Sequence, residues 1–201
     1  TGSGVDRVLG DHGVIDYHTD GTITNLQSTL ASQGAADTIT LYDGDTYVIA
    51  GSGNDSVTTT GNFNDYVLGD HGLITWDNAG VITEMKSESL AIGGNDTLSL
   101  ADGNHWVIGG FGVDTITAGE GNDIVLGDNG TATFESGILR QLISTDLSDA
   151  TGGDDQIVLG NGNTDVIGGA GSDTITTGDG VDRVLGDHGV IDYHTDGTIT
   201  N

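Results

Sequence analysis

The sequence predicts an all-β fold: a parallel β-roll, that is, a right-handed β-solenoid with recurring β-hairpin or enlarged-coil inserts. Three observations predict it. A nine-residue pattern recurs along the chain, a block of 58–59 residues recurs around that pattern, and glycine supplies 36 of 201 residues while proline and cysteine are absent. Short fixed periods are typical of solenoids, in which each repeat packs only against its neighbours.

The nine-residue pattern is the smallest element. Thirteen rows align on their sixth position, and ten of them carry Asp there. The ten are Asp6, Asp37, Asp55, Asp65, Asp96, Asp114, Asp123, Asp155, Asp173 and Asp182, while the other three rows have Thr46, His105 and Thr164. Two residues earlier eleven rows have glycine, and two residues later all thirteen have an aliphatic residue.

Each row predicts a turn followed by a very short strand. Glycine tolerates the positive φ of a tight turn. The single aliphatic side chain points inward and its neighbours point outward, because side chains alternate along a strand. Two rows make one coil, and the coils stack at roughly 4.8 Å, so that each strand pairs with the strand one coil away. The inward residues then form a thin apolar ladder between two parallel sheets.

The larger block is marked by the string VLGDHG, or VLGDNG in one case, at 8–13, 67–72, 125–130 and 184–189. We expect one continuous solenoid over 1–201, with units at about 5–63, 64–121 and 122–180 and the next copy starting at 181–201. Residues 4–25 recur letter for letter at 180–201, a displacement of 176. We therefore expect near-identical tandem copies in a longer protein, of which this chain is a piece.

Each block contains an insert after its GDHG or GDNG string, at 14–33, 73–92 and 131–151. The inserts alternate polar and apolar residues around a short polar turn, which predicts a β-hairpin or one enlarged coil. A helical turn over 84–90 is an alternative. We expect the aromatic residues of the inserts to pack them onto the roll, with a polysaccharide-binding surface as the alternative: Tyr17, Trp76, Phe134 and Tyr193. Tyr47 and Trp106 lie at outward positions of their rows and are expected to cover the sheet beneath an insert.

The charge is strongly one-sided, with 31 acidic residues against 4 basic ones and a net charge of -27. This excludes nucleic acid and anionic membrane surfaces as partners, since both need clustered Lys and Arg. It would also favour disorder, yet 34% of the residues are hydrophobic. Two aliphatic side chains per coil do not offset the entropy of ordering the coil. A divalent cation between stacked carboxylates would remove their repulsion and supply the missing stability.

A resemblance to a known repeat family is clearest in three of the rows: GGFGVDTIT (109–117), GGAGSDTIT (168–176) and TGDGVDRVL (177–185). They resemble the nonapeptide of the RTX, or haemolysin-type, calcium-binding repeats. The resemblance implies a β-roll that binds Ca²⁺, with each ion between turns of adjacent coils on the same edge. The Asp side chains and turn carbonyls of both turns would be its ligands.

Carried onto this sequence, the resemblance makes all ten Asp residues of the rows candidate metal ligands. The best same-edge pairs are Asp37 with Asp55, Asp96 with Asp114, and Asp155 with Asp173, each 18 residues apart. On the other edge Asp65, Asp123 and Asp182 would lie over Thr46, His105 and Thr164. Since these three are poor calcium ligands, we expect partial or absent sites there.

The GDHG and GDNG turns leave two interpretations open. Their carboxylates would be extra Ca²⁺ ligands or would cap the turn: Asp11, Asp70, Asp128 and Asp187. Their histidines, at 12, 71 and 188, suggest zinc at first. However, we expect neighbouring copies three coils apart, roughly 15 Å, which is too far to share a metal. Structural or surface histidines are the better interpretation.

The sequence therefore predicts a non-catalytic, calcium-binding spacer module of an extracellular or cell-surface bacterial protein, an adhesin or surface filament. The resemblance implies type I secretion of an unfolded chain that folds on external Ca²⁺. Lateral or end-to-end self-association is a further expectation, and no motif of an enzyme active site is present. The alternatives are a surface that binds ice or polysaccharide, and the secretion tail of an RTX enzyme or toxin. The first rests on Thr-Ile-Thr at 38–40, 115–117 and 174–176.

Overall fold

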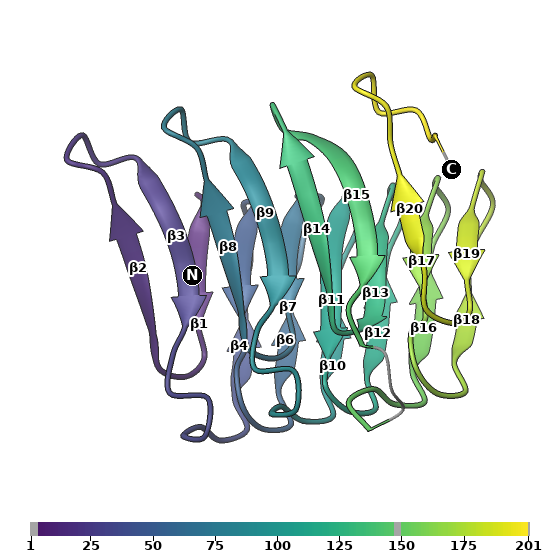
Figure 1. Ribbon diagram of the computed structural model, residues 1–201, viewed down its shortest axis with the longest axis horizontal. Coiled ribbons are helices and arrows are strands. Elements are labelled where there is room, and N and C mark those ends of the chain that lie inside the picture. Colours follow the sequence, from purple (N-terminus) through teal and green to yellow (C-terminus); the bar gives the residue numbers. More distant parts are fainter. Residues whose placement is uncertain (1–3, 147–149, 201) are drawn as a thin grey trace.

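The computed structural model describes residues 4–146 and 150–200. Every regular element in these ranges is a strand, and the strands form three sheets (Figure 1). The parallel β-roll predicted from the sequence is confirmed. The end of the third insert, residues 147–149, and the last residue of the repeated segment, Asn201, lie outside the described residues.

Each coil of the roll contributes one strand to each of two parallel sheets. One of these, which we call the central sheet, lies between the other two sheets of the molecule. All neighbours in it are parallel, and successive strands lie one coil apart, as Val48 beside Val67 illustrates. Its strands in spatial order are β1 (Asp6–Leu9), β5 (Thr46–Ile49), β7 (Asp65–Leu68), β11 (His105–Gly110), β13 (Ile124–Asp128), β17 (Asp165–Ile167) and β19 (Arg183–Leu185).

The outer sheet faces the central sheet across the roll and is also entirely parallel. Its strands in spatial order are β4 (Thr38–Thr40), β6 (Ser56–Thr58), β10 (Thr97–Ser99), β12 (Thr115–Ala118), β16 (Gln156–Leu159) and β18 (Thr174–Thr176). The aliphatic residues of both sheets meet between them. The apolar ladder expected from the rows is therefore present, with Val57, Leu98 and Ile116 fully buried in it.

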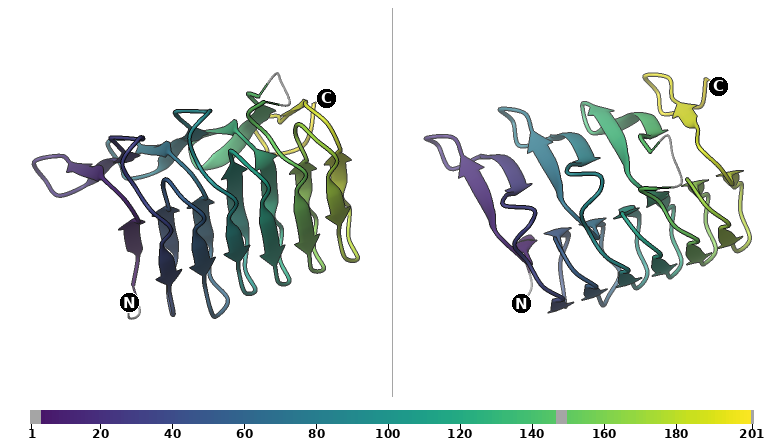
Figure 2. Two further views of the ribbon diagram at one scale, coloured as in Figure 1. Left: turned by 90° about the horizontal axis from the view of Figure 1, so that it is seen from below. Right: turned by 60° about the horizontal axis from the view of Figure 1, so that its bottom comes forward.

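The inserts are β-hairpins, and they join into a third sheet, the hairpin sheet (Figure 2). The enlarged-coil alternative is wrong, and so is the helical turn over 84–90, because Glu84–Ser87 belong to a strand. All pairs in this sheet are antiparallel. Its strands are β2 (Gly13–Tyr17), β3 (Ile23–Ser28), β8 (Gly72–Trp76), β9 (Ile82–Ser87), β14 (Gly130–Glu135), β15 (Ile138–Ser144) and β20 (Val190–Asp192).

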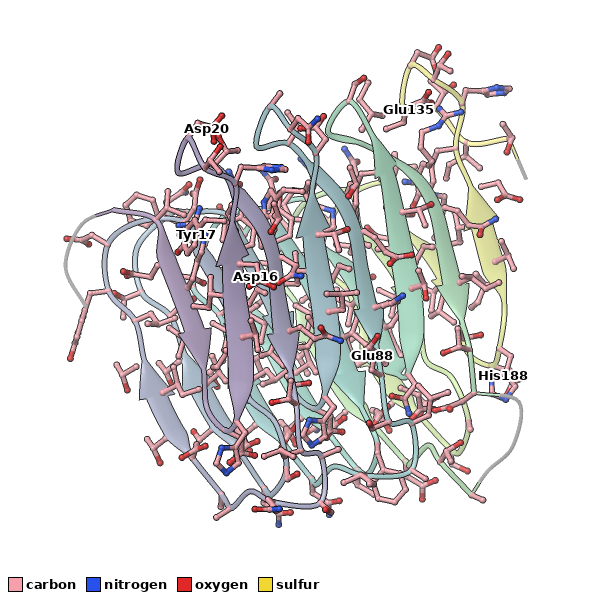
Figure 3. All side chains as sticks on the ribbon, turned by 60° about the vertical axis from the view of Figure 1, so that its left-hand side comes forward. Asp16, Tyr17, Asp20, Glu88, Glu135 and His188 are labelled. Carbon is pink, nitrogen blue, oxygen red and sulfur yellow. The ribbon has the colours of Figure 1, made fainter. Side chains whose placement is uncertain are left out.

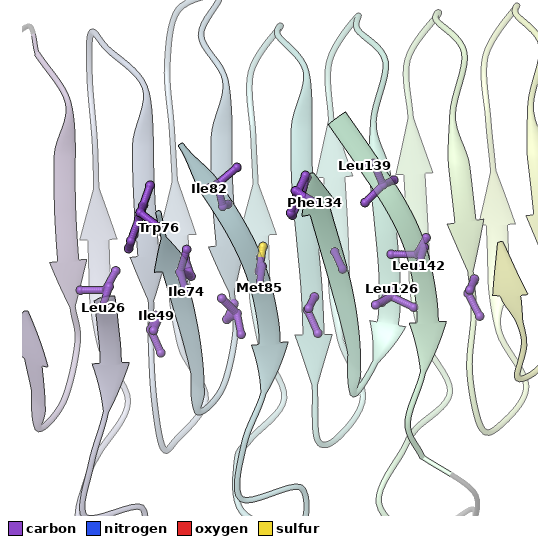
Figure 4. Packing of buried hydrophobic residues seen from close by; sticks show 14 of the residues in the cluster. Leu26, Ile49, Ile74, Trp76, Ile82, Met85, Leu126, Phe134, Leu139 and Leu142 are labelled. Atoms are coloured by element: carbon purple, nitrogen blue, oxygen red, sulfur yellow. The ribbon is translucent and has the colours of Figure 1, made fainter. Parts of the chain in front are cut away.

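The hairpin sheet covers the far face of the central sheet and creates a second hydrophobic core there (Figure 4). Hairpin residues such as Ile74, Met85 and Leu142 are buried against central-sheet residues such as Ile49 and Leu126. The central sheet is thus apolar on both faces, unlike the outer sheet. That arrangement matches the rule that parallel sheets are usually covered on both sides.

The aromatic residues lie mostly where the sequence predicts. Tyr47 and Tyr66 stack at 4.7 Å between ring centroids, and Tyr66 and Trp106 stack at 4.5 Å, all beneath the hairpins. Trp76, Phe134 and Tyr193 are buried and pack the hairpins onto the roll. Tyr17, which holds the equivalent place in the first hairpin, is 54% exposed.

The spacing of the blocks differs from the expectation. One block contains two coils with a hairpin attached beside them, because the hairpin adds no strand to either sheet of the roll. Neighbouring GDHG or GDNG turns therefore lie two coils apart, about 10 Å, and the predicted three coils are wrong. The distance is still too long for two such turns to share one metal.

Candidate calcium sites

The turns that lead from the central sheet to the outer sheet form the first edge of the roll. Each of these turns ends in Asp directly before an outer-sheet strand, and parallel pairing of the strands stacks these residues. We call the resulting column the Asp ladder: Asp37, Asp55, Asp96, Asp114, Asp155 and Asp173. The ladder contains the three pairs singled out from the sequence. It also joins them across the hairpins, which the spacing of 18 residues did not reveal.

Within the ladder, five of the six Asp residues, all but Asp37, accept a backbone N–H on one carboxylate oxygen. The N–H of Asp96 donates to Oδ1 of Asp114 at 2.8 Å, and the N–H of Asp114 donates to Oδ1 of Asp155 at 2.8 Å. The other three steps of the ladder show the same contact, with distances of 2.7 to 2.9 Å. These bonds fix the orientation of every carboxylate in the column except that of Asp37.

The second oxygen is different. Among the described residues, none donates a hydrogen bond to the buried Oδ2 of any of the six. The four central members are between 0% and 2% exposed, and the two end members are half-buried. Burial raises the pKa of Asp55 to about 6, of Asp96 to about 7 and of Asp155 to about 8, and it also raises the pKa of Asp114 well above its ordinary value. A buried charge without a partner costs free energy unless a cation or a proton neutralises it.

Glycine positions show what faces these unpartnered oxygens. A Cβ placed at Gly69 would collide with Oδ2 of Asp96 and with the carbonyl oxygen of Gly109 in the next coil. Equivalent collisions, each with the Asp Oδ2 of one coil and a turn carbonyl of the next, arise at Gly10, Gly109, Gly127 and Gly168. Two oxygens of successive coils thus converge on one small space, and glycine is needed there because any larger residue would fill it.

This donor set suits Ca²⁺. Calcium prefers six to eight oxygen ligands, including carboxylates and backbone carbonyls, in flexible geometry. In the described part of the chain, no three His, Cys, Asp or Glu side chains gather into one metal-binding group. Sites on the first edge would therefore need turn carbonyls besides carboxylates, and the resemblance implies Asp side chains and carbonyls from both turns as ligands. The ligand role of each Asp remains a prediction.

The carboxylates of the GDHG and GDNG turns behave as turn caps. Asp70 accepts hydrogen bonds from the N–H groups of Gly94 at 2.9 Å and Phe111 at 2.5 Å, one on each oxygen. Asp11 and Asp128 likewise accept backbone N–H groups on both oxygens. Burial, followed by the nearby Asp96 and Asp114, raises the pKa of Asp70 to about 10. The capped-turn interpretation explains all of these contacts.

The turns that lead into the central sheet form the second edge. Two of the row carboxylates there, Asp65 and Asp182, have their hydrogen bonds supplied by neighbouring side chains and backbone groups. Asp65 accepts from the hydroxyls of Thr46 and Thr59, both at 2.8 Å, and its Oδ2 lies 3.4 Å from Nδ1 of His105. Asp182 accepts from the hydroxyl and N–H of Thr164. In contrast, Oδ2 of Asp6 and of Asp123 has no hydrogen-bond partner among the described residues. The geometry at Asp65 and Asp182 agrees with the expected weakness of this edge.

The second edge also has a feature that the sequence interpretation missed. Asn side chains accept N–H groups of the next coil, as Asn122 does from Asn163 at 2.9 Å and Asn104 does from Asn122 at 2.9 Å. The series begins at Asp45 and ends with Asn163 accepting from Val181. The sequence contains a signal for this column, because Asn recurs directly before the sixth position of these rows. This column holds the coils together without a metal.

The turn histidines divide by burial. His71 is 2% exposed, and its Nε2 lies 2.7 Å from the hydroxyl of Ser52 and 3.1 Å from the carbonyl of Ala31. It therefore ties the loop after the first hairpin to the base of the second. His12 and His188 are exposed. These positions favour the structural and surface interpretation made from the sequence.

Comparison with known families agrees with the geometry. A family model described as RTX calcium-binding nonapeptide repeat (4 copies) matches residues 29–57, 101–133 and 159–189. No curated protein is significantly similar to the chain. The repeats of this family bind Ca²⁺ and serve as structural modules. In the described residues there is no helix of the length and hydrophobicity needed to cross a bilayer.

Proposed function

Because this chain is built from RTX calcium-binding repeats, we propose that it is a calcium-dependent spacer of an extracellular bacterial protein, an adhesin or surface filament. It leaves the cell unfolded and folds when it meets external Ca²⁺. It catalyses no reaction, and the ten row Asp residues are its candidate ligands, with those of the Asp ladder as the main ones.

One observation carries the proposal: the Asp ladder presents six similarly oriented carboxylates, each with a buried Oδ2 that no described residue satisfies. Stacking them at roughly 4.8 Å brings like charges together in a partly desolvated column. Without a cation these carboxylates oppose folding, and with Ca²⁺ bound they hold adjacent coils together.

Mass action explains why external Ca²⁺ favours the folded state. A ligand that binds only the folded chain stabilises it more as its concentration rises above the dissociation constant. Weak sites with dissociation constants of about 10⁻⁴ to 10⁻³ M are typical of extracellular calcium modules. Several such sites on one roll remain vacant at cytosolic Ca²⁺ and fill outside the cell, which couples secretion to folding.

Circular dichroism with and without chelator tests the proposal. We expect the β-sheet signal at millimolar Ca²⁺ to disappear on adding EDTA and to return when Ca²⁺ is restored in excess. Calorimetric titration measures how many ions the folding transition takes up. A β signal that EDTA leaves unchanged would refute calcium-dependent folding.

The outward face of the outer sheet favours a second candidate function, the binding of ice. Strand register places two ranks of side chains there: Thr38, Ser56, Thr97, Thr115, Gln156 and Thr174 in one, and Thr40, Thr58, Ser99, Thr117, Val158 and Thr176 in the other. Each rank carries hydroxyls on five of six strands and no charge, although the chain carries -27. The sequence pattern alone had shown this motif only about once per block.

The array repeats at roughly 4.8 Å across the strands and 6.6 Å along them, and it contains no aromatic ring on which a sugar could stack. Incorporation of the calcium-loaded protein into a growing ice crystal tests the idea. Thr115→Lys should abolish incorporation, while Thr133→Lys, on the outward face of the hairpin sheet, should leave it unchanged. Exclusion of the unmodified protein from the ice would end this candidate.

A further inference from the structure

The identical segments 4–25 and 180–201 lie at opposite ends of the roll, so the structure shows the same residues in two settings (Figure 3). The first segment is covered on the side of the following coil, and the second on the side of the preceding coil. We infer that the C-terminal end of the roll is a docking surface for a further copy of this chain, with Asp165, Arg183 and Tyr193 as the joint. This inference rests on the proposed tandem spacer.

The arginine of the repeated segment makes a different contact in each setting. Arg183 in β19 forms two parallel bonds to Asp165 in the preceding coil, through Nε to Oδ1 and through Nη2 to Oδ2, the latter at 2.8 Å. Arg7 in β1 instead lies over the ring of Tyr47 in the following coil, 5.8 Å from its centroid. In a continuous array one arginine makes both contacts, a paired carboxylate on one side and an aromatic face on the other.

The tyrosine of the segment shows what is lost when the preceding copy is missing. Tyr193 is 7% exposed, and its hydroxyl donates to Oδ2 of Asp165 at 2.6 Å. Tyr17, the same residue at the other end, is 54% exposed (Figure 3). Asp165 is 4% exposed and accepts from both the arginine and the tyrosine. The joint therefore satisfies a buried carboxylate with two donors of the next copy.

An apolar recess lies open on the C-terminal side. It encloses about 340 Å³ and is lined by Arg183, Val184, Leu185, Val190, Ile191 and Ile199. In the first setting two of the counterparts are covered, since Val8 pairs with Val48 and Ile23, the counterpart of Ile199, is 5% exposed, whereas Val14, the counterpart of Val190, remains 41% exposed. The occupant of the recess is therefore the stretch equivalent to residues 26–49 of the next copy.

Asp165 also determines where the next copy joins. The ladder of outward central-sheet positions reads Arg7, Tyr47, Tyr66, Trp106, Ile124, Asp165 and Arg183. Asp165 is its one acidic member. A copy joined at any other coil would leave this buried carboxylate without its arginine, and an unpaired buried charge is strongly destabilising.

The experiment uses a two-copy chain in which residues 26–201 follow Asn201, studied in saturating Ca²⁺. From β1 to β19 the central sheet advances by six strands, which is roughly 29 Å at the usual spacing. Small-angle scattering should show a straight rod longer than the 201-residue chain by about this amount. Thermal unfolding should remain a single transition with a higher midpoint, because stacked repeats stabilise their neighbours.

Variants of the first copy test the joint itself. Asp165→Leu should split the transition in two and make the rod flexible, and Asp165→Asn, which is isosteric, should do so more weakly. Asp16→Asn removes an exposed carboxylate far from the joint and should change neither readout. A flexible two-copy chain, or an Asp165→Leu variant that stays straight with one transition, would overturn the inference. Loss of calcium-dependent folding in the 201-residue chain would instead count against the proposed function.

Discussion

At the scale of single residues, the roll depends on how each carboxylate is neutralised. Asp70 has two backbone donors, and Asp165 has an arginine and a tyrosine. In the Asp ladder every residue has one unpartnered oxygen, and all but Asp37 have one backbone donor. These three classes share the same side chain, so the sequence pattern alone did not separate ligands from caps at GDHG. The hydrogen-bond partners do separate them.

The neighbouring residues Asp154 and Asp155 allow one member of the Asp ladder to be tested by itself. Asp155→Asn removes the charge of a buried ladder residue, while the amide oxygen still accepts the N–H of Asp114. We expect the Ca²⁺ concentration for half-folding to rise roughly ten-fold, which corresponds to about 1.4 kcal/mol. The control is Asp154→Asn, an exposed neighbour whose Oδ1 accepts the N–H of Ser172. Equal effects of the two substitutions on the folding midpoint would exclude a special role for Asp155.

The pH dependence should change sign with calcium. Without metal, burial raises the pKa of Asp96 to about 7 and of Asp155 to about 8, from an ordinary value of 3.8. The folded state then binds more protons than the unfolded state, so its stability is fullest below about pH 4 and is lost as pH rises through 7 and 8. In EDTA the β-sheet signal, which we expect to be lost at neutral pH, should therefore return as the pH falls from about 8 towards 4. In Ca²⁺, which needs the ionised form, affinity should rise over the same range.

A β-sheet signal in EDTA that grows as the pH rises would contradict this linkage. Asp155→Asn provides the control, since removing one of the titrating carboxylates should flatten the EDTA profile. The pH profile in saturating Ca²⁺ should be less affected, because the remaining Asp residues of the ladder still bind Ca²⁺.

At the scale of elements, the two parallel sheets differ in what they present outward. Four central-sheet strands, β5, β7, β11 and β13, carry large apolar residues on both sides of the inward valine, as in Tyr47-Val48-Ile49, whereas most outer-sheet strands carry Thr or Ser, as in Thr115-Ile116-Thr117. This difference is visible in the sequence and predicts that one sheet is covered. What the sequence did not show is that hairpins from separate blocks pair with each other, because that pairing depends on contacts about 50 residues apart, such as Leu26 with Ile74.

Two neighbouring residues of β15 test the contribution of the hairpin layer. Leu142 is 1% exposed in the core between the hairpin and central sheets, while Ile143 is half-buried on the other face. Leu142→Ala should lower the free energy of unfolding by about 2–5 kcal/mol, and Ile143→Ala by less than about 1 kcal/mol. Urea unfolding in saturating Ca²⁺ measures both. Similar losses would mean that the hairpin sheet adds little to the fold.

At the scale of the whole molecule, the two edges divide the work of holding the coils. The Asp ladder leaves one carboxylate oxygen of each member without a donor, whereas the Asn side chains of the second edge accept N–H groups of the next coil, as Asn54 and Asn95 do on the first edge. The resemblance and the row spacing predicted which Asp residues share the first edge, including the three same-edge pairs, while their role as ligands stays a prediction. The Asn residues before the sixth position were visible in the sequence, but the sequence alone did not show which backbone groups of the next coil their side chains would meet.

This division predicts that charge neutralisation alone does not fold the chain. At about 1 M NaCl the screening length falls to roughly 3 Å, so the general repulsion of a chain with net charge -27 is largely removed. Sodium cannot bridge an Asp Oδ2 and a carbonyl of the next coil as strongly as a divalent ion, and Mg²⁺ favours a smaller, rigid octahedral shell that retains water.

We expect millimolar Ca²⁺ to give the compact β-sheet state. Equimolar Mg²⁺ and 1 M NaCl should each contract the chain without forming the β-sheet state. Hydrodynamic radius and far-ultraviolet circular dichroism measured on the same samples separate the two responses. If NaCl alone restored the full β signal, the second edge and the two cores would suffice for folding, and calcium would act only as a counter-ion.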